Sequence, residues 1–243
     1  MNFTSNILQK ILFCFLLSLP INLIAATEPL HPGEFKKWIY PGWKLIQIAH
    51  GDLNRDGKDD IVLVLQNEDP VNFKKNEGFG EKLLNLNPRR LLILFKNESG
   101  YELNTLVEKF LPSANDAEST CLEDPLDNGG VKISKGLLKI DLHYWSSCGG
   151  WSVSHDVWSF RHENNRFKLI GLDKWHFARN SGERSESSRN YLTGKIKRTT
   201  GMNEFTKGAK PSVVWKNMAR RVMFLDEMTS GCWADDKVQE WCE

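Results

Sequence analysis

The sequence predicts a mainly β protein, built as an antiparallel meander of strands and hairpins. Short apolar runs rich in β-branched residues stand between clusters of Gly, Asn, Asp and Ser, a pattern typical of strands and turns. Apolar and polar residues alternate from Val131 to Tyr144, which indicates one buried and one solvated sheet face. Few segments show the 3.6-residue period of an amphipathic helix. We therefore expect a single β-rich domain over residues 27–228.

An acidic segment separates the first two expected strands. Residues 45, 46, 48 and 61–65 are apolar, and "GDLNRDGKDD" at 51–60 lies between these two groups, so this segment is predicted to be the loop that joins the strands. Residues 35–38 favour a single helical turn. The polar stretch 67–88, with its Pro, Gly and Asn residues, is predicted to be a long excursion.

Turn signals divide the rest of the chain into hairpins. The predicted turns are Asn-Glu-Ser-Gly at 97–100, Ser-Lys-Gly at 134–136, Ser-Cys-Gly-Gly at 147–150 and Glu-Asn-Asn at 163–165. Residues 179–190 are polar throughout and are predicted to be a solvated loop. For residues 211–228 two alternatives stay open: a strand with a short helix, or a final meander.

The segment 1–26 has the pattern of a secretory signal peptide. A positively charged residue precedes a mostly apolar run at 11–24, and Ala26 offers a small-residue cleavage site. Pro20 and Asn22 interrupt the run before it reaches the roughly 20 apolar residues that a membrane-spanning helix needs. We therefore expect an exported protein, periplasmic or secreted, with no stable membrane anchor after cleavage.

The charge balance gives no support for two classes of partner, nucleic acids and membrane surfaces. The chain has 243 residues and a formal net charge of +1, and Lys10 leaves with the expected leader, so the mature chain would be neutral. No basic stripe runs along it. Electrostatics therefore provide no argument for binding nucleic acid or a membrane surface.

Four cysteines remain after the expected cleavage: Cys121, Cys148, Cys232 and Cys242. In an exported protein four cysteines suggest two disulfides, for which three pairings are possible. We favour Cys121–Cys148 and Cys232–Cys242, the second of which would pin the short tail 229–243 on itself. The spacings match no zinc pattern, so the disulfide interpretation is preferred.

The acidic loop carries a pattern of metal ligands. Oxygen-bearing groups recur at alternate positions, namely Asp52, Asn54, Asp56, the backbone carbonyl of Lys58, and Asp60. Alternate residues of a tight loop can converge on one point, and Gly57 permits the sharp turn. Carboxylate and amide oxygens are hard ligands, which favours calcium (Ca2+) over zinc or copper. Position twelve is Leu63 where a helical EF-hand loop has Glu, so we expect a calcium loop between strands; the alternative is a solvated hairpin without an ion.

The same residues resemble a known family. "GDLNRDGKDDIVLVLQ" is similar to the FG-GAP/VCBS repeat, the calcium-loop unit of integrin-type β-propellers. Segments between residues 33 and 198 also resemble small exported bacterial proteins of unknown function that carry a single such repeat. The resemblance implies ligand roles for the five loop residues named above. A propeller needs several repeats and this chain has one, so the expected fold is related to a propeller-type β unit and is not a closed multi-blade propeller.

Two further groups of residues lie around the turn at 147–150. His143 and His155 fall opposite one another on the expected hairpin; with a nearby acid they are candidates for a metal site, but sheet-surface histidines are the simpler interpretation. The same hairpin carries three tryptophans, Trp145, Trp151 and Trp158. They either form an aromatic platform for a sugar or peptide or pack in the core, and packing is favoured.

These observations lead to three functional hypotheses. The first is an exported binding or interaction module with a structural calcium ion and a protein or glycan ligand in the cell envelope. The second is an enzyme, such as a hydrolase of envelope polymers, which is less favoured because no catalytic motif is present. The third is an inhibitor or chaperone-like envelope protein that docks a partner through the tryptophan-rich hairpin.

Overall fold

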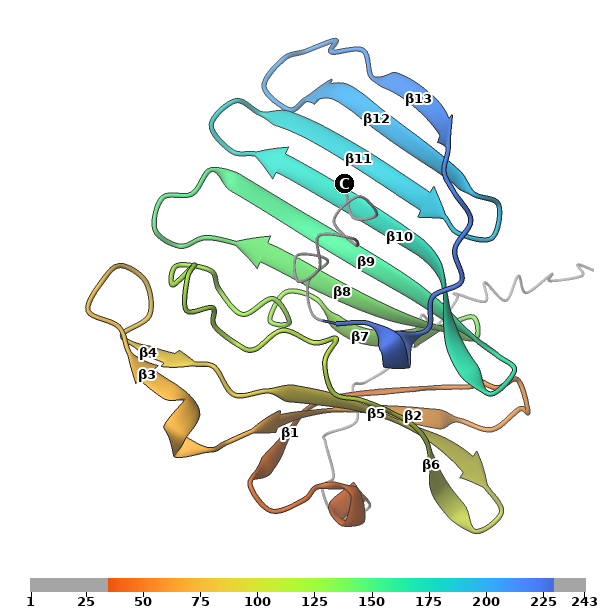
Figure 1. Ribbon diagram of the computed structural model, residues 1–243. Coiled ribbons are helices and arrows are strands. Elements are labelled where there is room, and N and C mark those ends of the chain that lie inside the picture. The colour runs from red at the N-terminus through yellow and green to blue at the C-terminus, as the bar shows by residue number, and fades with distance from the viewer. Residues whose placement is uncertain (1–34, 230–243) are drawn as a thin grey trace, which may run out of the picture. The chain divides into compact units, whose positions relative to one another are not determined.

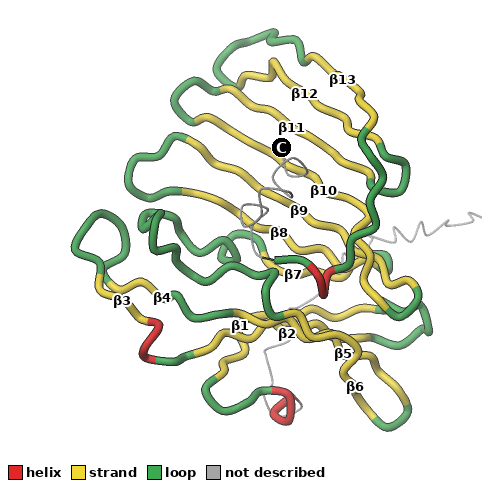
Figure 2. The backbone as a smooth tube through the Cα atoms, viewed as in Figure 1, coloured by secondary structure: helices red, strands yellow, loops and turns green. Residues whose placement is uncertain are grey.

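In the computed structural model, which describes residues 35–229, the chain forms two antiparallel sheets and a separate short hairpin (Figures 1 and 2). Helix in this part of the chain is limited to short 3-10 turns, and there is no closed barrel or propeller. The predicted fold class is confirmed. None of the described helices is long and apolar enough to cross a membrane. The expected leader and the expected Cys232–Cys242 disulfide lie outside the described residues.

The smaller sheet has four strands in the order β1-β2-β5-β6. Their bounds are β1 Trp43–Gly51, β2 Asp60–Asn67, β5 Arg89–Asn97 and β6 Gly100–Val107. Between β2 and β5 the chain forms the 3-10 turn η2 (Pro70–Asn72) and a hairpin of β3 (Phe73–Lys75) and β4 (Leu83–Asn85). The predicted excursion at 67–88 therefore contains a short hairpin of its own.

The larger sheet has seven strands, and each strand pairs with the next one along the chain. Their bounds are β7 Gly130–Ser134, β8 Leu137–Trp145, β9 Ser152–Glu163, β10 Arg166–Ala178, β11 Glu183–Asn190, β12 Lys195–Asn203 and β13 Ser212–Asn217. The 3-10 turns η1 (Lys36–Trp38) and η3 (Leu225–Glu227) flank the sheets in sequence. The helical turn predicted at 35–38 is confirmed, and 211–228 proves to be a strand followed by a short helical turn.

Strand β2 is buried on both faces, which explains its uninterrupted apolar sequence. Val62 and Val64 belong to the core cluster that lies between the two sheets. Ile61 and Leu63 belong to a second cluster, on the other face of the small sheet, which Phe35 covers. The acidic loop therefore leads directly into the most deeply buried strand of the small sheet.

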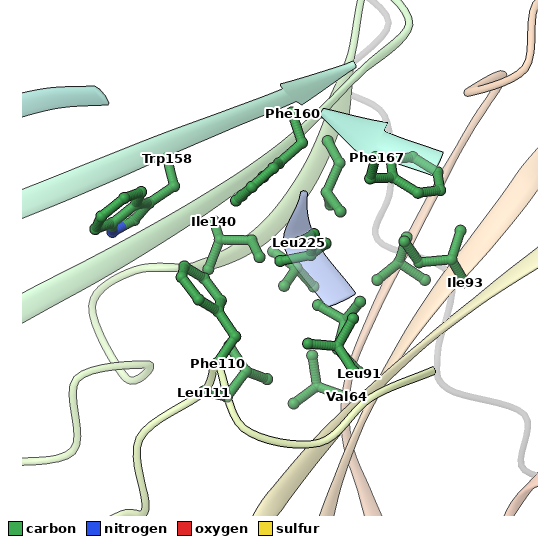
Figure 3. Close-up of a cluster of buried hydrophobic side chains, with 14 of the residues drawn as sticks. Val64, Leu91, Ile93, Phe110, Leu111, Ile140, Trp158, Phe160, Phe167 and Leu225 are labelled. Atoms are coloured by element: carbon green, nitrogen blue, oxygen red, sulfur yellow. The ribbon is translucent and has the colours of Figure 1, made fainter. Parts of the chain in front are cut away.

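The main core lies between the two sheets, as Figure 3 shows. Val64 and Leu91 reach into it from the small sheet, and Ile140 and Phe160 reach into it from the large one. Leu225 of η3 is fully buried among them. Burying such side chains stabilises the fold by roughly 1.5–3 kcal/mol each, so this cluster is what holds the two sheets together.

The predicted hairpin turns are confirmed, and two of them have the backbone that tight hairpins need. Lys135 and Gly136 between β7 and β8 have φ of +55° and +71°, and Asn164 and Asn165 between β9 and β10 have φ of +51° and +62°. Two successive residues with positive φ match the right-handed twist of the strands on either side.

The prediction of a solvated loop at 179–190 is wrong for most of its length. Residues 183–190 form β11, which pairs with β10 on one side and β12 on the other. The sequence "ERSESSRN" has no apolar residue, so it lacks the usual signal of a strand. Its backbone groups are satisfied by two ladders, which hold this polar segment in the sheet.

Candidate functional site

The acidic loop after β1 is a tight turn that its own side chains stabilise. Arg55 and Gly57 have φ of +66° and +83° and fold the chain back. The carboxylate of Asp52 accepts the backbone N–H groups of Arg55 at 2.6 Å, Asp56 at 3.2 Å and Gly57 at 3.0 Å. Asn54 and Asp56 each accept the N–H of the residue two positions later. These bonds satisfy backbone donors that would otherwise lack partners.

Asp60 lies beneath this loop and is fully buried. Its Oδ2 accepts the N–H groups of Leu53 at 2.8 Å and Asn54 at 3.2 Å, and its Oδ1 accepts the N–H of Lys96 on β5 at 3.1 Å. Burial raises the pKa of Asp60, these backbone donors lower it, and the charge of Asp56 raises it further. Asp60 therefore ties the loop to the neighbouring strand.

The predicted metal ligands are neighbours in this loop and differ in their exposure. Asp52 and Asn54 are partly exposed, Asp56 and Lys58 are exposed, and Asp60 is underneath. Among residues 35–229, no three His, Cys, Asp or Glu side chains form a group that could hold a metal ion. The residue types themselves fit calcium, because they offer the hard oxygen donors that this ion takes.

A groove of about 1160 Å³ lies over part of the large sheet. One wall is the segment from Pro112 to Pro125, which links β6 to β7. The floor is formed by side chains of β8 to β12, among them Tyr144, Asp156, Lys174, His176, Ser187 and Arg198. A typical small-molecule pocket has roughly 300–1,000 Å³, so this groove has room for an extended ligand.

The centre of the floor is a row of side chains that stand opposite one another on neighbouring strands. The register pairs Asp156 with Lys174, Lys174 with Ser187, and Ser187 with Arg198. Lys174 Nζ lies 3.3 Å from Asp156 Oδ2. Burial raises the pKa of the Asp156 carboxyl, and the charges of Lys174 and Arg189 lower it in part.

Arg189 lies two residues from Ser187 along β11, on the same sheet face and nearer the core, and is only 3% exposed. Its Nη1 has no hydrogen-bond partner, and burial lowers the pKa of its guanidinium. Its charge interacts with those of Arg198 and Asp156. Lys174, Arg189 and Arg198 thus lie near the carboxylate of Asp156, and Asp116, Glu118 and Glu186 also line the groove, so the site carries charges of both signs.

A buried ion pair holds the wall of the groove. The Arg89 guanidinium is almost fully buried and pairs with the Asp124 carboxylate through both of its terminal nitrogens. Its Nε donates to Gln66 Oε1 at 2.9 Å, and its Nη1 also donates to the Pro112 carbonyl at 3.3 Å. Such bidentate pairs fix geometry as well as charge. The small sheet therefore holds both ends of the wall segment.

The disulfide Cys121–Cys148 makes a second attachment, and it confirms one of the two predicted pairings. It joins the wall segment to the turn between β8 and β9, with the Cα atoms 5.5 Å apart. The Cys121 carbonyl also accepts the backbone N–H of Ser147 at 2.9 Å. The wall is therefore fixed to the sheet that forms the floor, and the groove is a preformed feature.

The predicted histidine pair lies on the other face of the large sheet. His143 stands opposite His155, with ring centroids 4.5 Å apart. His155 Nδ1 lies 3.0 Å from Asp141 Oδ1. Burial lowers the pKa of His143, and the neighbouring His155 lowers it further. No metal-binding group of three such side chains is found in the described chain, and these residues fit the simpler interpretation of sheet-surface histidines.

The three tryptophans of the hairpin do not form one platform. Trp158 is buried in the core, where the Phe110 ring packs edge-on at 5.5 Å. Trp145 stands opposite Val153, an odd number of positions from Trp158, so alternation places it on the other sheet face. Trp151 lies in the turn and is exposed. The packing interpretation holds for Trp158.

The residues of the groove were not predicted from the sequence. Lys174, Ser187 and Arg198 come from three strands, and only the sheet register brings them together. The segment 183–190 is polar at every position, so the alternation of its side chains between the two sheet faces leaves no pattern in the sequence. Without an apolar set, this alternation did not stand out as a strand.

Comparison of the chain with protein-family models, with curated proteins and with solved structures found no match.

Proposed function

We propose that this protein is an exported binding domain whose ligand site is the groove over the large sheet. The groove itself is the observation that supports the proposal most: it is large, lined by apolar as well as polar and charged side chains, and walled by a segment with two attachments. A site that is rigid before binding loses less entropy when the ligand arrives. The ligand would be a protein segment or a glycan of the cell envelope.

A matched pair of substitutions on β11 tests this site. Ser187→Trp would fill the groove, whereas Ser188→Trp adds the same side chain at the next residue, on the opposite face of the sheet. Purified protein would be screened by thermal shift against soluble envelope glycans and peptides. We expect a ligand that raises the Tm of wild type and of Ser188→Trp but not of Ser187→Trp. Equal responses of the two variants, or no response to any class, would overturn the proposal.

We also propose that the acidic loop binds calcium through Asp52, Asn54, Asp56, the Lys58 carbonyl and Asp60. The ion would be structural. It would neutralise carboxylates that are crowded between β1 and β2, and so stabilise the turn that leads into the core strand. The supporting observations are the oxygen-rich residue types and a backbone already folded back at Gly57. The likeness to the FG-GAP/VCBS repeat supports the same proposal.

Calcium binding is tested by calorimetry on protein stripped with EDTA. If the dissociation constant is about 10⁻⁴ M, as in extracellular modules, 10 mM calcium stabilises the fold by about 2.7 kcal/mol through mass action. Asp56→Asn should lose this gain, whereas Asp59→Asn removes the same charge from a position outside the ligand set and should keep it. An unchanged Tm for wild type on addition of calcium refutes the site.

A further inference from the structure

We propose that the outer edge of the large sheet is a second binding surface, which attaches the protein to an anionic lipid surface. This edge consists of β13 and the segments on either side of it, residues 205–222. None of these residues lines the groove. The inference therefore goes beyond the proposed function and does not depend on the ligand of the groove.

β13 is the last strand at one end of the large sheet. The strand order begins with β13 and ends with β7, which contacts β1 of the small sheet, and Figure 1 shows β13 as the outermost strand. β12 pairs with one side of β13, and no other strand of the described chain pairs with its other side. All six residues of β13 are exposed. The strand thus presents both of its faces and its outer backbone groups to solvent.

Exposed apolar side chains gather at this edge. Phe205, Trp215 and Val222 are 64%, 63% and 62% exposed, and Val213 and Val214 are exposed as well. Together they are five of the thirteen large apolar side chains that are exposed in the described part of the chain. A contiguous group of such residues marks an interaction site, whereas single exposed residues do not.

The same edge is strongly basic. Residues 205–222 contain no Asp or Glu and five exposed cations, which are Lys207, Lys210, Lys216, Arg220 and Arg221. The nearest acids in sequence are already paired, because Glu204 lies 3.5 Å from Arg184 and Asp226 lies 2.6 Å from Arg166. The neutral balance expected for the whole mature chain therefore hides a local excess of positive charge, which favours an anionic partner.

Protection of an edge strand explains only part of this pattern. A lysine on an edge strand discourages pairing with another chain, and Lys216 can serve that purpose. It explains neither the exposed Trp215 in the same strand nor the cations in both flanking segments. A second copy of this chain is also a poor occupant, because pairing β13 with itself would bring two basic edges together.

The distribution of these side chains over both sheet faces favours a lipid surface over a folded partner. The register places Trp215 opposite Lys197 and Val214 opposite Arg198, and successive residues of a strand point to opposite faces. Each face of this strand pair therefore carries an apolar side chain beside a cation. One protein surface would cover a single face, whereas the interface of a bilayer can surround both.

The depth of insertion follows from the same residues. Trp is enriched at the boundary between headgroups and acyl chains, and Lys and Arg side chains can extend from that boundary to the phosphates. The outer N–H and C=O groups of β13 need polar partners, which the hydrocarbon region does not provide. The edge would therefore enter only to the depth of the headgroups, where water and phosphate oxygens can bond to these groups.

The test measures binding to lipid vesicles by co-sedimentation, with purified protein that lacks residues 1–26. The expected leader is left out because its apolar run would itself bind lipid, and the described fold starts later, at residue 35. Wild type should bind vesicles of phosphatidylglycerol and phosphatidylcholine at least tenfold more tightly than vesicles of phosphatidylcholine alone. Raising the salt from about 0.1 M to about 1 M should weaken this binding, because salt screens exposed charges.

Two variants that lose the same three positive charges locate the surface. The edge variant carries Lys207→Gln, Lys210→Gln and Lys216→Gln. The control variant changes exposed residues of β1 and β3, and carries Lys44→Gln, Lys74→Gln and Lys75→Gln. A cation near an anionic surface raises the affinity about fivefold. The edge variant should therefore bind at least tenfold more weakly than wild type, whereas the control variant should stay within about twofold of it.

Trp215→Ser tests the apolar contact separately. Because Trp215 is exposed, the substitution should leave the Tm unchanged. It should weaken binding to vesicles that contain phosphatidylglycerol by about threefold or more, because less apolar surface then enters the interface. Sedimentation velocity of the same proteins without lipid reports whether a second copy covers the edge.

Four results would overturn the inference. Equal binding to the two kinds of vesicle would show that charge on the lipid is not recognised, and equal binding by the edge variant and its control would show that the edge is not the surface. Unchanged binding by Trp215→Ser would show that the apolar side chains stay outside the bilayer. A wild-type dimer that Trp215→Ser dissociates would show that the edge is covered by a second copy.

Discussion

The two ends of one face of the large sheet differ in what their side chains contact: one end is buried against the small sheet, and the other lines the groove. At the inner end, Ile140, Trp158 and Leu172 stand opposite one another and are buried against the small sheet. Two residues further outward along the strands, on the same face, Asp156 and Lys174 take the corresponding places on β9 and β10. The strands and their ladders are continuous through both ends. The difference shows that ladder hydrogen bonds suffice to extend a sheet beyond its core, which leaves the outer side chains available for binding.

The largest change in the free energy of unfolding should come from a substitution at the inner end. Phe160→Ala removes a fully buried ring that packs between the sheets, and we expect a loss of about 3–5 kcal/mol in the free energy of unfolding. Ser187→Ala at the outer end should change it by less than about 0.5 kcal/mol. Urea denaturation of both variants measures the contrast. Similar losses at the two ends would mean that the outer end is also part of the stabilising core.

The buried ion pair between Arg89 and Asp124 connects the two regions, because it holds the groove wall on the small sheet. Arg89→Met leaves the carboxylate of Asp124 without its partner, and we expect a loss of about 3–4 kcal/mol. Combining it with Asp124→Leu should recover much of that loss, because no unpaired charge then remains. Additive losses in the double variant, measured by urea denaturation, would contradict this account.

Loss of the disulfide should lower the free energy of unfolding by less than loss of a large core side chain, and by about as much as loss of a single strong contact. Replacing Cys121 and Cys148 together by Ser removes a link across 27 positions of the chain. The expected loss is about 2–3 kcal/mol, chiefly because the unfolded chain is less constrained. The effect is read from urea denaturation under non-reducing conditions. Wild type treated with a reductant should match the variant; a reductant that lowers the stability of the variant as well would point to an additional disulfide.

The strands at the apolar end of the large sheet could be predicted from the sequence, but the arrangement of residues at its polar end could not. The alternation from Val131 to Tyr144 and the turn signals at 134–136 and 163–165 gave the strands of the core correctly. These signals arise because burial selects apolar side chains at every second position. The Cys121–Cys148 disulfide, which was favoured among three possible pairings, is also present.

The groove could not be predicted from the sequence, because it is formed by contacts between residues that are far apart in the chain. The strand at 183–190 is stabilised by its neighbours β10 and β12, and its own residues have little preference for strands. Lys174 and Arg198 come together only through the register of the sheet. The acidic loop differs in this respect, because its candidate ligands lie within nine consecutive residues, and so its pattern is visible in the sequence alone.

The smallest expected effect is the pH dependence of the stability that Asp156 contributes at the outer end. Burial raises the pKa of Asp156 above its ordinary value of 3.8, with Lys174 and Arg189 opposing and Asp141 reinforcing the shift. In this case the folded state holds the proton more tightly than the unfolded state. The contribution of Asp156 to stability is therefore fully present below about pH 3.8 and is lost as the pH rises through its folded pKa.

The variant Asp156→Asn isolates this contribution, because its side chain stays uncharged at every pH. Relative to wild type, it should gain stability as the pH is raised from about 4 to 7, by less than any change above. The difference in Tm between the two proteins, measured at several pH values in constant salt, gives the result directly. A constant difference would show that Lys174 and Arg189 fully compensate the ionised carboxylate, and a difference of opposite sign would show that they over-compensate it. Either result would mean that the cations around Asp156 offset more of the cost of burying its charge than its raised pKa implies.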